Sequence, residues 1–297
     1  MTPIPRFVPP PYPDAGSRRL PRADLRVGLG QFLDLKACGL RSLVAERNSA
    51  LGRLEGDSIR LVYEHALAAG LARCLARLEE SGDDPALATA LRGILQAKQL
   101  DAGPMLWNAT FGGREFAALY RVSAPAFDPM RAEPAPEDAI RDLAGIVSHY
   151  GREDFALRRD SLVRAFEVLE RSAHGGRLAK ALGRATDQLA AATRLVEESP
   201  CPVSPGDEWV GLETRFESGD VGRWLDALTD AGERWHSALD QLLEAQHAPP
   251  PAGFIEYYSQ VMDPANDKGI WPAFLSARQH HEGAWAGLSV RCASMGV

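Results

Sequence analysis

The chain has 297 residues and a mass of 32.2 kDa, with 45% hydrophobic and 25% charged residues, which is the composition of an ordinary globular protein. This length is enough to bury a core and excludes a disordered chain or a mini-protein. The formal net charge of −7 argues against a general nucleic-acid binder, because neutralising phosphates requires a surplus of Lys and Arg. No apolar run approaches the roughly 20 residues that span a bilayer.

The first 21 residues are rich in proline and show no apolar periodicity. Proline fixes φ and removes a backbone donor, so we expect residues 1–21 to form an extended arm that contains no helix. As a spacer, an arm of this length would reach roughly 40 to 60 Å. The arm lacks the charged start and apolar stretch of a signal peptide. Either the protein is cytoplasmic, or its export segment has been removed.

Helical periodicity dominates the rest of the first half of the chain. Apolar residues recur three and four positions apart from Asp24 up to a break at residues 52–56, and again from Asp57 to Leu78. We expect these two segments to form an antiparallel helical hairpin. Asp84-Pro85 is a strong start signal for a third helix. A broken helix over residues 105–120, interrupted by Gly112-Gly113, and a Pro-rich loop over 124–136 complete this group.

The second half predicts further helices, separated by loops. His174-Gly175-Gly176 is interpreted as a helix stop. The expected ranges are 137–151, 155–169, 178–196, 221–246, 254–262 and 271–291. No segment has the sustained alternation of a β-strand. The prediction is an all-α bundle of about nine or ten helices with Pro-rich loops, in one domain over 22–297 whose groups 22–123 and 136–297 pack together.

Four cysteines occur without any C-x-x-C spacing, which argues against zinc and redox-motif sites. If the hairpin turns near residues 53–56, Cys38 and Cys74 lie at comparable heights on facing helices. A Cys38–Cys74 disulfide is therefore geometrically reasonable, and a Cys201–Cys292 bond would tie the C-terminus to a proline-bounded loop. Four cysteines allow three pairings, and the alternative is that all four are small buried apolar residues.

A motif in the predicted hairpin resembles a known family. It consists of Cys38, Leu40, Arg47-Asn48-Ser49-Ala50-Leu51-Gly52, Ser58, Arg60-Leu61 and Tyr63-Glu64. This pattern is similar to the "C-x-L … RNSSLG … S-x-R-L-x-Y-E" signature of the domain-of-unknown-function 3080 family of proteobacterial predicted lipoproteins. Ala50 replaces the usual second serine, which makes that hydroxyl dispensable. The resemblance covers nearly the whole chain after the arm.

The resemblance implies an exported, lipid-anchored envelope protein of a Gram-negative cell, with no established activity. Members begin with a signal peptide and a lipobox cysteine, and we expect both to have been removed from the N-terminal end. Export implies the periplasm, with an anchor in the outer or inner membrane. That oxidising compartment favours disulfides over free thiols.

Two polar clusters are candidate binding sites. In Glu46-Arg47-Asn48-Ser49, the arginine can pair bidentately with a carboxylate, the asparagine offers a donor and an acceptor, and the serine can cap a backbone group. The same groups would equally satisfy the orphan backbone groups of helix ends. A nucleophilic Ser49 would need a base that the sequence does not identify. Trp107, Asn108 and Glu115 form the second cluster, because an interrupted helix leaves free backbone groups beside an aromatic ring.

Other motifs favour structural roles. Two Glu-x-x-His pairs, Glu233/His236 and Glu244/His247, fall on one predicted helix and cannot surround one metal centre. Adjacent His280 and His281 point about 100° apart on a helix, so one should pack while the other meets water. The remaining aromatic residues would either line a groove or fill the core, and the core is the commoner role; they are Trp224, Trp235, Trp271, Trp285, Tyr257 and Tyr258. We predict neither a metal nor a cofactor.

The leading functional hypothesis is a non-enzymatic envelope lipoprotein domain, tethered to a membrane by the arm and presenting a surface to another envelope component, without nucleic acid as a partner. One alternative is an enzyme with a polar site around Arg47, Asn48, Ser49 and Glu115. Another is a helical carrier that encloses a small apolar ligand in a pocket of several hundred Å³.

Overall fold

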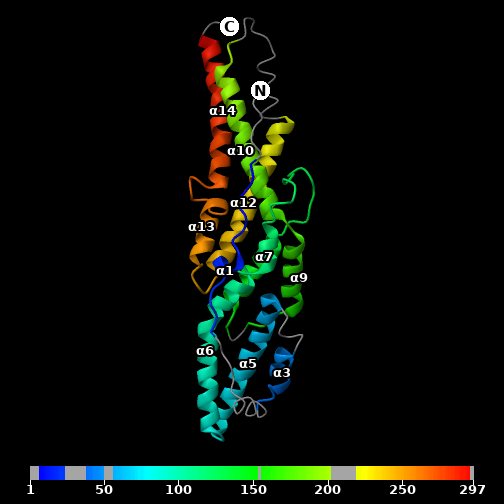
Figure 1. Ribbon diagram of the computed structural model, residues 1–297, viewed down its shortest axis with the longest axis vertical. Helices are drawn as coiled ribbons and strands as arrows, with labels where there is room; N and C mark the ends of the chain where they lie inside the picture. The colour runs from blue at the N-terminus through cyan, green and yellow to red at the C-terminus, as the bar shows by residue number, and fades with distance from the viewer. Residues whose placement is uncertain (1–6, 24–37, 50–55, 153–154, 202–218, 295–297) are drawn as a thin grey trace.

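The computed structural model describes residues 7–23, 38–49, 56–152, 155–201 and 219–294. Within these ranges the chain forms α-helices and no β-strand, which confirms the predicted all-α fold. The molecule is elongated (Figure 1). One end holds α3 (Arg41–Asn48), α5 (Asp57–Ser81) and α6 (Pro85–Ala109), and the other holds α10 (His174–Glu198), α12 (Asp220–Glu244) and α14 (Ile270–Ser294). The first part of the predicted hairpin, residues 24–37, lies outside the described residues.

The other described helices are α1 (Ala15–Arg18), α7 (Arg114–Leu119), α8 (Glu137–His149), α9 (Arg159–Arg171) and α13 (Ala252–Val261). Local sequence explains several helix ends. The Asp84 side chain accepts a hydrogen bond from the Leu87 amide at 2.9 Å and caps α6, with Pro85 in its first turn. α5 ends at Gly82, whose φ of 71° is the left-handed conformation that glycine adopts without strain.

The helix break near residue 112 is confirmed, although α6 is longer than predicted. α6 runs from Pro85 to Ala109 and passes through Pro104. The chain then folds back tightly, because the Gly112 amide donates to the Trp107 carbonyl at 2.8 Å. A Cβ atom on Gly112 would lie 2.9 Å from the Cα of Asn108, so only glycine fits this turn.

The predicted helix stop at His174-Gly175-Gly176 is wrong, because these residues form the first turn of α10. A Cβ atom on Gly175 would lie 2.6 Å from Tyr120 and 2.8 Å from Trp235. Glycine therefore serves close packing here, where a side chain would collide with two buried rings, and does not end a helix.

The buried residues form two clusters. The larger cluster extends from α6 to α14 and includes Trp107 and Phe254, whose rings meet edge-on with centroids 4.9 Å apart. The smaller cluster joins α3, α5 and α6 through residues such as Val44, Leu71 and Leu91. None of the helices in the described ranges combines the length and apolarity needed to cross a membrane.

Both proposed disulfides are present in the structure. Cys38 pairs with Cys74 and joins the segment before α3 to α5. Cys201 pairs with Cys292 and joins the segment after α10 to the last turns of α14. The two disulfides thus fasten the helix group at each end of the elongated body.

The expectation of a free extended arm needs correction. Residues 15–18 form the short helix α1, capped by the Asp14 side chain, which accepts from the Gly16 amide at 2.8 Å. The described part of the arm lies against the body and does not extend away from it (Figure 1). The arm carries the aromatic side chain of Tyr12 and the charged side chains of Arg19 and Arg22, all of which have partners on the body. A count of prolines does not reveal these contacts.

Candidate functional site

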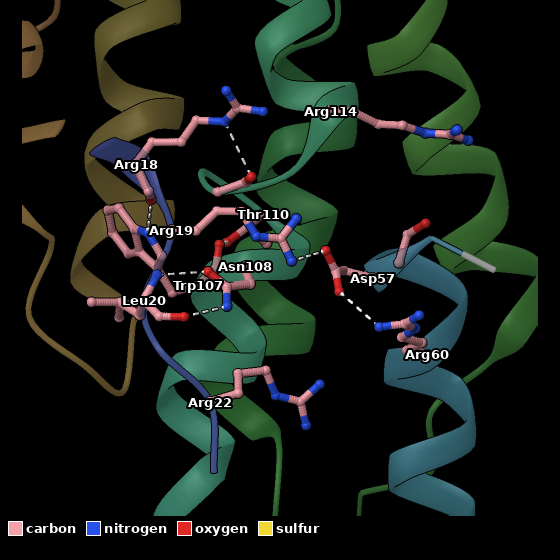
Figure 2. Close-up of polar contacts among 12 residues, drawn as sticks. Arg18, Arg19, Leu20, Arg22, Asp57, Arg60, Trp107, Asn108, Thr110 and Arg114 are labelled. Atoms are coloured by element: carbon pink, nitrogen blue, oxygen red, sulfur yellow. Dashed lines mark hydrogen bonds and ion pairs between the residues drawn. The ribbon is translucent and has the colours of Figure 1, made fainter. Parts of the chain in front are cut away.

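Residues 7–23, named the strap below, are held by side chains of α6. The indole Nε1 of Trp107 donates to the Arg18 carbonyl at 2.8 Å. The Asn108 amide both accepts from the Leu20 amide at 2.9 Å and donates to the Leu20 carbonyl at 2.8 Å (Figure 2). Trp107 is fully buried and Asn108 is 2% exposed. Two residues of the second predicted cluster, Trp107 and Asn108, therefore bind a segment of their own chain.

The end of the strap is fixed by a buried carboxylate. Asp101 accepts two hydrogen bonds from the Arg22 guanidinium, at 2.6 and 3.0 Å, and one from the Ala23 amide at 3.0 Å. Arg22 also lies 3.8 Å from Glu64, which pairs with Lys98 at 2.5 Å. These charges link the strap to both α5 and α6.

The middle of the strap is fixed by Tyr12. Its hydroxyl donates to the Phe111 carbonyl at 2.7 Å, and its ring stacks on Tyr120 at 5.2 Å and meets Tyr257 edge-on at 5.1 Å. Burial raises the pKa of Tyr12 well above its ordinary value, and the neighbouring Tyr257 adds to that shift. Tyr12 therefore acts as a neutral aromatic anchor.

An arginine cluster, defined as Arg19, Arg47 and Arg60, lies beside the start of α5. The Arg19 guanidinium pairs with Asp57 at 2.5 Å, and Arg60 lies 3.9 Å from the other oxygen of that carboxylate (Figure 2). Burial lowers the pKa of Arg60, and the positive charge of Arg47 lowers it further. Two guanidinium groups, those of Arg19 and Arg60, thus lie against one carboxylate.

The first predicted cluster lies at the C-terminal end of α3. Glu46, Asn48 and Ser49 are exposed on or just after α3, while Arg47 is half-buried with its guanidinium 5.8 Å from the centre of the Tyr63 ring. Burial raises the pKa of that tyrosine to about 12.

Glu115 lies apart from that group, in a buried position on α7. It accepts a hydrogen bond from Ser58 at 3.3 Å and one from Arg114 at 3.2 Å. No described contact joins Glu115 to Arg47, Asn48 or Ser49. The polar set of the enzyme hypothesis is therefore divided between α3 and α7.

A groove of about 740 Å³ lies between α5 and α6. Four alanines of α5 line it: Ala68, Ala69, Ala72 and Ala76. Its charged lining residues include Arg73 of α5, Lys98 of α6 and Arg152 of the segment after α8. His65 stands at one end, where it contacts Tyr150 and Phe155 with ring centroids 5.6 Å apart in each pair, and burial lowers its pKa. This groove is partly open and has charged side chains in its lining, whereas the carrier hypothesis expects an enclosed pocket with few polar groups.

The other candidate motifs take up structural positions. Trp235, Trp271 and Tyr257 are buried in the core, while Trp224, Trp285 and Tyr258 are half-buried. His236 of the first Glu-x-x-His pair is buried, and its Nδ1 lies 2.8 Å from the Met262 carbonyl.

Adjacent His280 and His281 behave as predicted. His281 is buried against Thr193 and Trp285, while His280 is exposed. Among the residues that the structure describes, no group of three or more His, Cys, Asp or Glu side chains is arranged to hold a metal ion.

Sequence reasoning missed the residues that dock the strap and form the arginine cluster. In the sequence, Asp57 is the start of a predicted helix, and neither Asp101 nor the arginines of the arm have a predicted role. A signal was available, because Arg18, Arg19 and Arg22 place three positive charges within five residues of a proline-rich segment. Such a run is stabilised by carboxylates nearby, which here are Asp57 of α5 and Asp101 of α6.

Comparison with known proteins gives one match. The sequence profile of a family described as "Protein of unknown function (DUF3080)" matches residues 2–208. The matched range includes the strap, the α6 residues that hold it, and the arginine cluster. No curated protein and no solved structure matches the chain.

Proposed function

The chain belongs to the DUF3080 family, and we propose that it is a non-enzymatic domain of the cell envelope that binds another envelope component. The observation that carries this proposal is the pairing of all four cysteines into two disulfides. Disulfides persist in oxidising compartments such as the bacterial periplasm and are rare in the cytosol. Paired cysteines therefore support an exported protein more strongly than composition does.

A lipid anchor on the N-terminal side of the strap is the proposed membrane attachment. Because the strap is docked from Tyr12 to Ala23, it would not act as a long spacer. An anchored molecule would then hold its body near the membrane. The attachment would fix the orientation of the body relative to the membrane as well as its distance from it, because the strap contacts α5, α6 and α13.

The proposed binding surface is the groove between α5 and α6. Its small residues would let the backbone of a partner segment approach α5 closely. Its charged side chains could form hydrogen bonds and ion pairs with that partner. Glu115 is buried and accepts hydrogen bonds from Ser58 and Arg114, as a structural carboxylate does, which favours this binding role over an enzyme. The charged side chains in the lining, such as Arg73, Lys98 and Arg152, favour surface recognition over a carrier of a small apolar molecule.

The compartment is tested by the state of the thiols. Protein prepared from the periplasm is alkylated before and after reduction, and its intact mass is measured. We expect four blocked thiols before reduction and four labelled thiols after it. Four freely labelled thiols before reduction would contradict the envelope assignment.

The partner surface is tested by photocrosslinking in cells. A crosslinking amino acid is placed at Arg73 or Gln99 in the groove, and at Asp138 on α8 as a control, where the native side chain is 90% exposed. We expect both groove positions to give an adduct with the same envelope component, and the control to give none. No adduct from the groove, or the same adduct from all three positions, would overturn the proposal.

A further inference from the structure

We propose that Glu137 and His174 form a proton-dependent hydrogen bond that controls how tightly the α7–α8 loop, residues 121–136, closes over α10. Glu137 is the first residue of α8, and His174 is the first residue of α10. Both residues are buried, with exposed fractions of 3% and 6%. Their side chains approach each other at 3.8 Å, between Oε1 of Glu137 and Nε2 of His174.

The two side chains face each other without a hydrogen bond, because 3.8 Å is too long for one. Among the residues that the structure describes, neither His174 Nε2 nor the second carboxylate oxygen of Glu137, Oε2, has a hydrogen-bond partner. A buried polar atom without a partner costs free energy, so a proton that joins the pair would stabilise it. A shift of about 1 Å would bring the oxygen and the nitrogen to hydrogen-bond distance.

One proton is enough to join the pair. When Glu137 takes a proton from solvent, its O–H group can donate to Nε2 of the neutral His174 ring, whose own hydrogen is then on Nδ1. This step neutralises a buried carboxylate and creates no other charge. Burial raises the pKa of Glu137 and lowers the pKa of His174 to about 4. The bond therefore forms as the pH falls through the raised pKa of Glu137, and it is lost near pH 4, where His174 itself is protonated.

Five charged side chains surround the pair. They are Asp138 and Arg141 of α8, Arg177 of α10, Glu133 of the α7–α8 loop, and Arg234 of α12. Four of them form two ion pairs, one within α8 and one between α10 and the loop. The fifth, Arg234, lowers the pKa of both Glu137 and His174, after the larger effect of burial in each case. No described hydrogen bond joins any of the five to Glu137 or His174, so the proton remains the link between these two side chains.

The α7–α8 loop covers the pair and is attached to α10. Its Phe127 ring meets the His174 ring edge-on at 4.9 Å, and the Phe127 amide donates to the Arg177 carbonyl at 3.0 Å. Because Glu137 directly follows the loop and His174 lies under it, a bond between them ties the end of the loop to α10. An ionised Glu137 instead favours opening of the loop, since opening lets water reach the carboxylate.

The first measurement follows the His174 ring in the purified full chain. Nitrogen-15 NMR spectra of histidine-labelled protein are recorded from pH 8 to pH 5, with the His174 signals assigned from their loss in His174→Phe. We expect the Nε2 signal to shift in one titration step while the ring stays neutral. Glu137→Gln should abolish the step, because its amide can donate to Nε2 at every pH. Glu133→Gln, which removes the neighbouring carboxylate, is the matched control and should keep the step.

The second measurement follows the loop by hydrogen–deuterium exchange, corrected for the intrinsic pH dependence of exchange. We expect peptides from residues 121–136 to exchange about fivefold more slowly at pH 5.5 than at pH 7.5, the usual effect of one buried hydrogen bond. In Glu137→Gln the loop should exchange equally slowly at both pH values. Peptides from α13 should show no such difference in either protein.

The outcomes separate a proton-dependent bond from a merely structural contact. A His174 signal that does not move in this range, or that moves equally in the parent and in Glu137→Gln, overturns the hydrogen bond. Equal exchange of the loop at both pH values in the parent overturns its control of the loop. Unfolding curves check that each variant is folded, and Glu137→Met, which is apolar and of similar length, is a second variant that should also abolish the step. These measurements use purified protein and do not depend on the envelope assignment.

Discussion

The side chain of Asn108 pairs with both backbone groups of Leu20, a residue 88 positions earlier in the chain. Its carbonyl oxygen accepts from the Leu20 amide and its NH2 group donates to the Leu20 carbonyl, as a neighbouring β-strand would do. These two hydrogen bonds involve the backbone of Leu20 and not its side chain. It explains how an extended segment is held against a helix without forming a sheet.

The first prediction concerns that pair. We expect Asn108→Ala to lower the free energy of unfolding by about 2 kcal/mol, because it removes two hydrogen bonds and leaves both Leu20 backbone groups without a protein partner. Urea unfolding measures this loss, and limited proteolysis should cut the strap faster. Asn48→Ala, at an exposed position on α3, is the control and should change stability by less than about 0.5 kcal/mol. Equal losses in the two variants would show that the pair does not hold the strap.

The second prediction concerns acid sensitivity at His174. Burial between Phe127 and Trp235 lowers its pKa to about 4, and the charge of Arg177 adds to the shift, while Glu133 opposes it. The folded state thus favours the neutral ring, so this residue contributes stability above pH 6.5 that is lost as the pH falls toward 4. The loss is about 3 kcal/mol at most.

His174→Phe preserves an aromatic ring at this position and cannot titrate. We expect the variant to show a flatter dependence of unfolding free energy on pH between 6.5 and 4, measured by urea unfolding at several pH values. A slope identical to that of the parent would show that His174 does not carry this acid sensitivity.

The third prediction concerns Glu137, whose contribution to stability changes with pH in the direction opposite to that of His174. Glu137 lies 3.8 Å from the His174 ring, and burial raises its pKa, so the ionised form is disfavoured in the folded state. This contribution to stability is present below the ordinary pKa of a glutamate and is lost as the pH rises through the raised value. Glu137→Gln should therefore increase stability at pH 7. It should also steepen the loss on acidification, because protonation of Glu137 no longer offsets that of His174. Lower stability of this variant at pH 7 would contradict the argument.

The fourth prediction ranks the two disulfides. The Cys38–Cys74 and Cys201–Cys292 bonds close loops with sequence separations of 36 and 91. Chain entropy then gives a stabilisation of about 4 and about 5 kcal/mol, respectively. We expect the Cys201→Ser/Cys292→Ser variant to lose more stability than Cys38→Ser/Cys74→Ser, as measured by thermal unfolding. The reverse order would show that packing around Cys74, and not loop length, dominates.

The fifth prediction compares two helical glycines. Gly175→Ala should lower stability by about 1 to 3 kcal/mol, because its Cβ would press on Tyr120 and Trp235. Gly93→Ala on α6 is the matched control, since a Cβ there meets nothing within 4 Å. That control should raise stability by up to about 1 kcal/mol through better helix propensity. Similar effects at both positions would contradict the packing role of Gly175.

Local rules predicted much of the fold. The Asp84 cap, the break at Gly112 and the apolar periodicity all depend on residues within a few positions of one another, so a single sequence contains the necessary information. The Cys38–Cys74 prediction used only the fixed rise of a helix and an assumed turn. The bond is present, but the helical premise is wrong at Cys38, which lies in a turn before α3, where Gly39 has a φ of 68°.

Long-range contacts could not be predicted in the same way. The pairs Trp107–Arg18 and Asn108–Leu20 join residues almost ninety positions apart, and no periodicity links a proline-rich segment to a particular helix. Gly175 shows a different limit, because a glycine that ends a helix and a glycine that admits a ring look identical in sequence. The candidate site shows the first limit, because Asn108 is a predicted binding residue whose side chain bonds Leu20 of its own chain.

The docking of the strap also orders events during biosynthesis. The strap is among the first segments to leave the ribosome, yet its partners on α6 are made some 78 to 89 residues later. At 5 to 20 residues per second, that interval is roughly 4 to 18 seconds. During this time Leu20 lacks its partner Asn108. Tyr12 waits longer, because its ring contacts include Tyr257, which is made 245 residues after it.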